Sequence, residues 1–138
     1  MKKIAIITGL FIASFSFAQN VVSYINKTTN NKVEREKILD AIRKEGKKQM
    51  KQEFIFKPNK FNVSSNGYAW IETELFRKDG KKIQTEEDWM DCCHAEAFLK
   101  KTNGQWKVIE AGFFSTDVWW LSSQSKWIKQ GAPKTIFE

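Results

Sequence analysis

The chain has 138 residues and a formal net charge of +7, with 41% hydrophobic, 14% aromatic and 28% charged residues. This composition is not that of a disordered protein, and the length suits a single domain that buries about two thirds of its surface. After the first eighteen residues no apolar stretch is long enough to cross a bilayer, so we expect no stable membrane anchor.

The first eighteen residues have the three parts of a secretory signal. Two lysines form a basic start, an apolar run follows to Phe17, and Ser16 and Ala18 are small residues at the positions that signal peptidase reads. We therefore expect a signal peptide at residues 1–18, a single domain at residues 19–138, and a secreted or periplasmic location.

A polar lead-in and a helix are expected next. Residues 19–30 are mostly polar and should pack loosely. Asn31 and Glu34 have the spacing of a capping box, in which each side chain accepts a free backbone N–H at the start of a helix. An apolar stripe at helical spacing follows, formed by Ile38, Leu39 and Ile42. These features predict a helix over residues 32–50, with Gly46 as a point where it could end early.

After residue 53 the pattern changes to strands. Segments rich in β-branched and aromatic residues alternate with turn signals, and Asn-Gly and Asp-Gly are typical of the type I′ turns that join antiparallel strands. The expected strand segments cover residues 54–63, 68–76, a long piece from 82 to 100, and 105–114. Pro58 cannot donate a ladder hydrogen bond, so the first of these strands should be an edge strand or carry a bulge there.

The last two strands have a specific expected register. A two-residue loop at Asn103-Gly104 predicts three facing pairs, which are Lys101 with Trp106, Leu99 with Val108, and Ala97 with Glu110. The opposite face would then carry Phe98, Ile109, Ala111 and Phe113. Because both faces hold apolar side chains, the sheet should be covered on both sides, at least in part.

A second helix should follow the sheet. Ser115 or Thr116 can cap a helix that begins at Asp117, and Gly131 and Pro133 can end it. One helical face would carry Trp120, Leu121, Gln124, Trp127 and Ile128. The predicted class is α+β: a helix packed across a four-stranded antiparallel meander, closed by a C-terminal helix.

Several segments are similar to those of a known group of proteins. They are residues 35–43, Ala69-Trp70, residues 104–108, Asp117-Val118-Trp119 and Gly131-Ala132-Pro133. With the predicted element order, they resemble small secreted bacterial proteins with an NTF2-like or cystatin-like fold, over most of residues 33–137. The resemblance implies a sheet that curls around a pocket, which a terminal helix can close, and it implies no catalytic residue.

Cys92-Cys93-His94 is the most unusual segment. We interpret the cysteines as reduced and structural, one in the core and one shielded. A disulfide between the two neighbours is the first alternative. A metal or catalytic site is the second, with Cys92, His94 and Glu96 as donors. Zinc needs four ligands and the chain has one histidine and two cysteines, so we expect no metal and no cofactor.

Basic side chains gather in clusters. They are Arg43, Lys44, Lys47, Lys48 and Lys51, then Lys57 and Lys60, then Arg77, Lys78, Lys81 and Lys82, and finally Lys100, Lys101 and Lys107. A solvated surface is the simpler interpretation, and a patch for an anionic polymer, a membrane surface or an acidic protein is the alternative. Nucleic acid is not expected as the partner of an exported chain without an interleaved aromatic-basic strand motif.

The paired tryptophans direct attention to a ligand site. Side chains of consecutive helical residues lie about 100° apart, so only one of Trp119 and Trp120 can point into a core. The candidate ligand-binding residues are Trp70, Trp119, Trp120, Cys93 and His94.

The expected function is that of an exported, non-enzymatic binding or interaction domain for a small apolar ligand or a partner protein. One alternative is a small exported enzyme that uses Cys92, Cys93 or His94, with a carboxylate such as Glu72 or Glu110. Another is a periplasmic inhibitor or immunity-type protein that acts through a basic surface.

The signal sequence gives a first test. We expect cleavage between Ala18 and Gln19, because Ser16 and Ala18 supply the small side chains that the peptidase requires. Mass spectrometry of the protein exported by its native host should find Gln19 at the N-terminus. A mature protein that keeps Met1 or Lys2 would contradict both the signal and the location.

Overall fold

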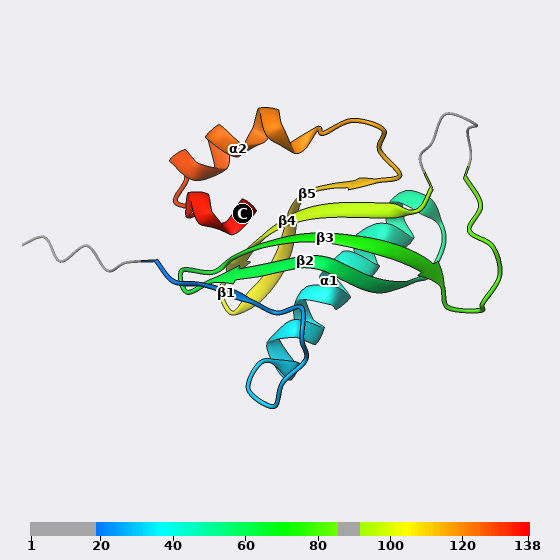
Figure 1. The fold of residues 1–138 in the computed structure, drawn as a ribbon, viewed down its shortest axis with the longest axis horizontal. Helices are drawn as coiled ribbons and strands as arrows, with labels where there is room; N and C mark the ends of the chain where they lie inside the picture. Colours follow the sequence, from blue (N-terminus) through cyan, green and yellow to red (C-terminus); the bar gives the residue numbers. More distant parts are fainter. Residues whose placement is uncertain (1–18, 86–91) are drawn as a thin grey trace, which may run out of the picture.

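The computed structural model describes residues 19–85 and 92–138, and the predicted signal peptide at residues 1–18 lies outside the described residues. An antiparallel sheet with strand order β1-β2-β3-β4-β5 has α1 on one face and α2 on the other (Figure 1). The elements are β1 (Val21–Ser23), α1 (Lys32–Met50), β2 (Phe54–Ser64), β3 (Tyr68–Arg77), β4 (His94–Thr102), β5 (Gln105–Phe113), α2 (Trp120–Lys129) and the 3-10 helix η1 (Lys134–Phe137). The α+β class is confirmed, with five strands in place of four. Neither helix in this part of the chain could cross a bilayer.

The additional strand lies in the segment that was expected to pack loosely. Val21–Ser23 pairs with the last residues of β2, from Asn62 to Ser64. Three residues are too few for a recognisable alternation of polar and apolar side chains, so the neighbouring strand and not local sequence determines this element.

Helix α1 has the predicted bounds but not the predicted cap. The Asn31 side chain accepts the backbone N–H of Thr28 instead of one inside the helix. Glu34 accepts hydrogen bonds from Lys101 Nζ at 2.6 Å and Trp106 Nε1 at 2.7 Å, and so joins α1 to the β4–β5 hairpin. The helix continues through Gly46, and a small residue fits there because a Cβ would lie only 3.0 Å from the Phe113 ring.

Strand β2 contains the irregularity predicted at Pro58. Its register with β3 shifts between Pro58 and Lys60. Because β1 pairs only with Asn62–Ser64, the first part of β2 is also an edge of the sheet. Both expected consequences of the proline are therefore present.

The β4–β5 hairpin follows the predicted register for only part of its length. Asn103 and Gly104 have φ values of 51° and 75°, and the pairs of Lys101 with Trp106 and of Leu99 with Val108 are as predicted. A bulge between Phe98 and Leu99 then shifts the register. Ala97 consequently faces Ala111 and not Glu110, so the predicted pair there is wrong, and Ala111 and Phe113 lie on the α1 face.

Each face of the sheet has its own apolar core. The α1 face buries side chains that include Ile38, Ile42, Phe61, Ile71, Leu99 and Phe114. The α2 face buries Tyr68, Trp70, Phe98, Trp127, Ala132 and Ile136. Helix α2 begins at Trp120 and not at Asp117, because the Ser115 hydroxyl accepts the Asp117 N–H in a local turn instead of capping a helix.

The turn at Asn103-Gly104 gives a test of the hairpin. Nothing lies near a Cβ built on Gly104, so its positive φ is the only obstacle to a side chain. We expect Gly104→Val to destabilise the domain by about 1–3 kcal/mol in urea denaturation. Gly104→Asn should cost much less, since asparagine tolerates this conformation. Equal stability of the two variants would contradict the turn.

Candidate functional site

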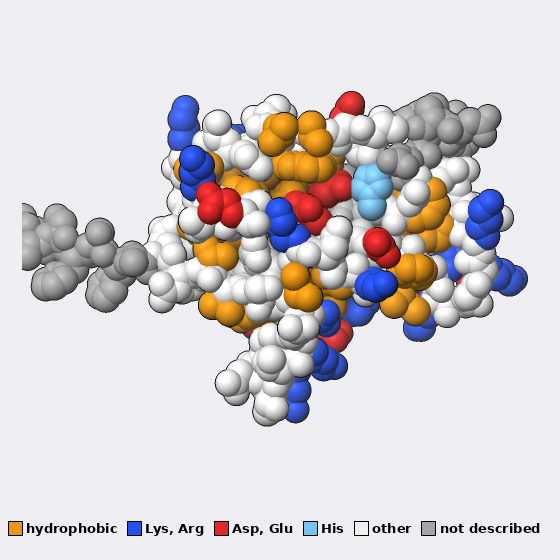
Figure 2. Space-filling view, viewed as in Figure 1, with side chains coloured by type: hydrophobic (Ala, Val, Ile, Leu, Met, Phe, Trp, Pro, Cys, Tyr) orange, Lys and Arg blue, Asp and Glu red, His pale blue; other side chains and the backbone are white. Residues whose placement is uncertain are grey.

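Helix α2 and η1 cover only part of the sheet face on which they lie. Beyond the aromatic core, this face continues as a group of charged side chains that we name the polar strip. It consists of Lys57 and Lys60 from β2, Glu72 and Glu74 from β3, and His94 and Glu96 from β4. Figure 2 shows acidic, basic and histidine side chains together in the middle of this surface, beside apolar ones.

The strip exists because the register of three strands brings its residues together. Glu72 is the cross-strand partner of both Lys60 and Glu96, and Glu74 is the partner of His94. Side chains at every second position of a strand share a face. Glu72 and Glu74 therefore lie on the same face as Trp70, and His94 and Glu96 on the same face as Phe98. Trp70 and Phe98 are themselves buried in the aromatic core.

The two central carboxylates are each held by an indole and a basic group. Trp70 Nε1–H donates to Glu72 Oε1 at 3.0 Å, and Lys60 Nζ lies 3.2 Å from the same oxygen. Trp119 Nε1–H donates to Glu96 Oε2 at 3.2 Å. His94 Nε2 lies 3.4 Å from Glu96 Oε1 and 2.9 Å from the carbonyl oxygen of Ser115.

These surroundings make the two carboxylates different. The Glu96 side chain is only 7% exposed, whereas that of Glu72 is 29% exposed. Burial raises the pKa of Glu96 above its ordinary value of 4.5; the His94 charge and the Trp119 bond oppose this, and the Glu72 charge adds to it. Glu96 therefore holds a proton more readily in the folded protein than a free glutamate does.

Trp119 can reach Glu96 because β5 has a glycine beneath the indole. Gly112 is the cross-strand partner of Glu96, and a Cβ on Gly112 would collide with Nε1 of Trp119. The glycine thus lets the indole lie against the sheet and donate to the carboxylate.

The three predicted tryptophans come together over the sheet. The Trp70 ring centroid lies 6.3 Å from that of Trp119 and 5.6 Å from that of Trp120. Trp70 is 1% exposed, while Trp119 and Trp120 are half-buried. Both members of the pair reach Trp70, although Trp119, the N-cap residue of α2, has helical backbone angles of φ −51° and ψ −32°. The expectation that only one of them points into a core is therefore wrong.

His94 joins this group through Glu96, but Cys93 does not. Cys93 packs against the core on the α1 face, on the opposite side of the sheet. Cys92 and Cys93 form a disulfide with each other. The first alternative therefore applies, and the preferred interpretation as reduced cysteines is wrong. Bonded sulfurs offer no thiolate nucleophile or metal ligand.

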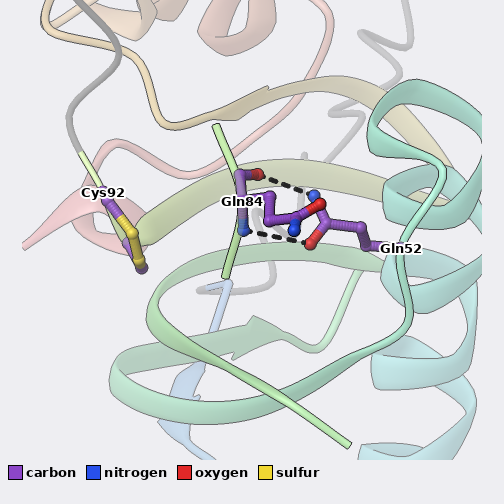
Figure 3. The surroundings of a disulfide bond; sticks show 4 residues. Gln52, Gln84 and Cys92 are labelled. Carbon is purple, nitrogen blue, oxygen red and sulfur yellow. Dashed lines mark hydrogen bonds between the residues drawn. A yellow bond between two sulfur atoms is a disulfide. The ribbon is translucent and has the colours of Figure 1, made fainter. Parts of the chain in front are cut away.

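The segment before the disulfide is held near the end of α1. Gln52 Nε2–H donates to the carbonyl oxygen of Gln84 at 2.8 Å, and the Gln84 N–H donates to Gln52 Oε1 at 3.4 Å (Figure 3). The Gln52 side-chain amide thus bonds to both the N–H and the carbonyl group of Gln84, as the backbone of a neighbouring strand would. No sequence motif indicated this pair.

Sequence reasoning found some members of the site and missed others. Glu72 and Glu96 were considered, but as separate candidates for catalysis and for metal binding. Lys60 and Gly112 were missed. Trp70 and Glu72 are two residues apart, as are His94 and Glu96, so the sequence alone places each pair on one face of its strand. Only the register of β3 with β4 shows that both pairs lie on the same face of the sheet.

Across residues 19–85 and 92–138, no three histidine, cysteine or acidic side chains are grouped so that they could hold a metal ion. Comparisons of this chain with family models, curated proteins and solved structures found no match.

The pKa of Glu96 gives a test of this geometry. A raised folded-state pKa means that its contribution to stability is complete below pH 4.5 and is lost as pH rises through the folded value. Glu96→Gln has no such loss, so the stability of this variant relative to the natural protein should increase from pH 4 to pH 7. Urea denaturation of both proteins across this range measures the difference.

Glu110→Gln is the matched control, because Glu110 is an exposed carboxylate on β5. Its stability relative to the natural protein should stay nearly constant over the same range. A Glu96→Gln difference that stays constant or falls as pH rises would contradict the buried, protonatable carboxyl.

Proposed function

We propose that the chain is an exported, non-enzymatic binding domain of the NTF2-like or cystatin-like type, and that its ligand binds on the polar strip against Trp119 and Trp120. A helix packed across an antiparallel meander supports this assignment of the fold. The observation that carries the function is the Glu96 carboxylate, fixed between the Trp119 indole and His94 at the border of α2. Rigid polar groups beside aromatic side chains are typical of ligand sites.

The chemistry of the strip selects the ligand. Ionised carboxylates only accept hydrogen bonds, so a ligand that binds Glu72 has to bring donors, as an amine or a hydroxyl group does. The half-buried rings of Trp119 and Trp120 favour an apolar ring or chain next to that group. The proposed ligand is thus a small molecule with an apolar part and a donor group.

The ligand position follows from the packing of the aromatic core. The Trp127 and Phe98 rings are stacked at a centroid distance of 4.2 Å, and Phe137 covers both. These rings fill the space between the sheet and α2 with their own side chains. A ligand on the strip needs no displacement of this core.

An acid–base enzyme is the second candidate, and one observation favours it. Glu72 and Glu96 are cross-strand partners; Glu96 is nearly buried and has a raised pKa, whereas Glu72 is more exposed and lies beside Lys60. Such a pair can divide the roles of general acid and general base between two carboxyls. In this alternative Glu96 donates the proton and Glu72, beside Lys60, acts as the general base.

A ligand screen tests the binding proposal. Small amines, sugars and other hydroxylated rings are added to the protein, with simple carboxylic acids as the comparison set, and tryptophan emission and thermal stability are measured. Ligands with donor groups should bind, and Glu72→Gln should weaken them by about tenfold, since a hydrogen bond to a charged group is lost. Glu110→Gln, the same change outside the strip, should leave binding unaltered.

The same ligands separate the two functions. A binding domain leaves them chemically unchanged, and Glu96→Gln, which keeps an acceptor for Trp119, still binds them. Turnover that disappears in Glu96→Gln would establish the enzyme. Hits restricted to carboxylic acids, or equal effects of Glu72→Gln and Glu110→Gln, would overturn the site.

A further inference from the structure

A hollow of about 520 Å³ lies beside the disulfide, where β3 continues past the first residue of β4. Its lining includes the buried apolar side chains of Leu75 and Ile83 and the exposed lysines Lys81 and Lys82. Cys93, which is half-buried, lines the same hollow. Hollows of this volume are typical of sites for small molecules.

The backbone around this hollow is held in place. The Gln52 side chain bonds to both backbone groups of Gln84, which directly follows Ile83 (Figure 3). The carbonyl oxygen of Cys93 accepts the Leu75 N–H at 2.9 Å, so the disulfide is attached to β3. The hollow is therefore part of the folded structure.

The disulfide restrains the chain very little. A disulfide stabilises a fold mainly by closing a loop in the unfolded chain, and its effect grows with the number of residues in that loop. Cys92 and Cys93 are neighbours in the sequence, so their bond encloses no other residue. Stability therefore gives little reason for this bond, whereas its position beside a hollow suggests a chemical one.

The two cysteines differ in access. Cys92 is exposed, whereas Cys93 is half-buried and packs against the core on the α1 face. A thiolate attacks the disulfide sulfur that it can reach, and the other sulfur leaves as a thiolate. Exposed disulfides are also the ones that small thiols reduce readily. Attack is therefore expected at Cys92, with Cys93 as the leaving group.

The hollow can stabilise the negative charge that this reaction releases. Among the ion pairs of residues 19–85 and 92–138, none includes Lys81 or Lys82. Arg77 also lines the hollow but is paired with Asp79, and Glu74 in the lining offsets one of the two lysines. The positive charge that is left favours a thiolate at Cys93 and attracts a thiol that carries a negative group.

From this arrangement we infer that the Cys92–Cys93 bond is a thiol–disulfide exchange site for a low-molecular-weight thiol with a negatively charged group. The thiolate forms a bond to the Cys92 sulfur, the bond between the two cysteines breaks, and its electron pair leaves on the Cys93 sulfur, which takes a proton from water. A second small thiol then attacks the mixed disulfide and releases Cys92. The protein disulfide gains two electrons, and two small thiols become one small disulfide.

This inference does not rest on the proposed function. The exchange needs none of Glu72, Glu96 and Trp119, which hold the centre of the polar strip.

The product of the first step tests the roles of the two sulfurs. The folded protein is treated with mercaptopropionate, alkylated with iodoacetamide, and digested at acid pH, where exchange stops because thiolates are protonated. Tandem mass spectrometry should find the small thiol on Cys92 and the alkyl group on Cys93. The folded protein should react at a rate close to that of the urea-unfolded protein, because Cys92 is already exposed.

Two thiols of similar size and opposite charge test the hollow. Mercaptopropionate should react about threefold faster than cysteamine, after correction for the thiolate fraction of each reagent, as is usual for exposed charges. Lys81→Glu with Lys82→Glu should remove or reverse this preference, and raised salt should weaken it. Lys126→Glu with Lys129→Glu makes the same change in net charge on exposed positions of α2 and should leave the preference unaltered.

The stability of the reduced protein separates an exchange site from a structural bond. Because the bond encloses no other residue, the reduced protein should unfold at nearly the same urea concentration as the oxidised one. Circular dichroism of both forms checks the fold.

The inference is wrong if the small thiol is found on Cys93, or if the folded protein reacts far more slowly than the unfolded one. It is also wrong if the two charge-reversed pairs change the preference equally, or if the reduced protein unfolds at a much lower urea concentration. The last result would show that the bond is structural.

Discussion

The stack of Trp127 on Phe98 is the interaction on which the α2 face depends. The two rings are nearly parallel, and both are almost fully buried. Because Phe98 is on β4 and Trp127 is near the end of α2, the stack fixes the helix over one half of the sheet. The polar strip is what remains uncovered, and Trp119, at the other end of the helix, becomes its border. The position of α2 thus determines both where the aromatic core lies and which part of this sheet face stays uncovered as the candidate site.

Much of the fold could be predicted from local sequence. The bounds of α1 followed from its apolar stripe, and β2, β3 and β5 followed from their side-chain patterns and the turns between them. Some errors arose where a distant residue competes for a local group. Glu34 did not cap α1, since Lys101 and Trp106 offer it stronger donors. The bulge after Phe98 has no local signal, so the predicted register failed beyond it.

The candidate site was predictable only in part, for the same reason. Aromatic composition pointed to Trp70, Trp119 and Trp120 as candidates, but helix geometry predicted that only one of the last two points into a core, whereas both lie near Trp70. Adjacency in the sequence suggested Cys93 as a companion of His94, yet neighbouring residues of an extended chain serve opposite faces. The link between Glu72 and Glu96 depends on strand register, and the link between Glu96 and Trp119 depends on the path of the chain after β5.

The contact between Gly112 and the Trp119 indole has a consequence for how such a sequence can diverge. A Cβ at position 112 would lie 2.2 Å from Nε1 of Trp119, the atom that donates to Glu96. The two positions are therefore constrained as a pair. A homologue with a larger residue at 112 should carry a smaller side chain at 119, and its Glu96 equivalent should be replaced by a residue that needs no indole donor. Co-variation of these three positions would mark which descendants of this sequence retain the same surface.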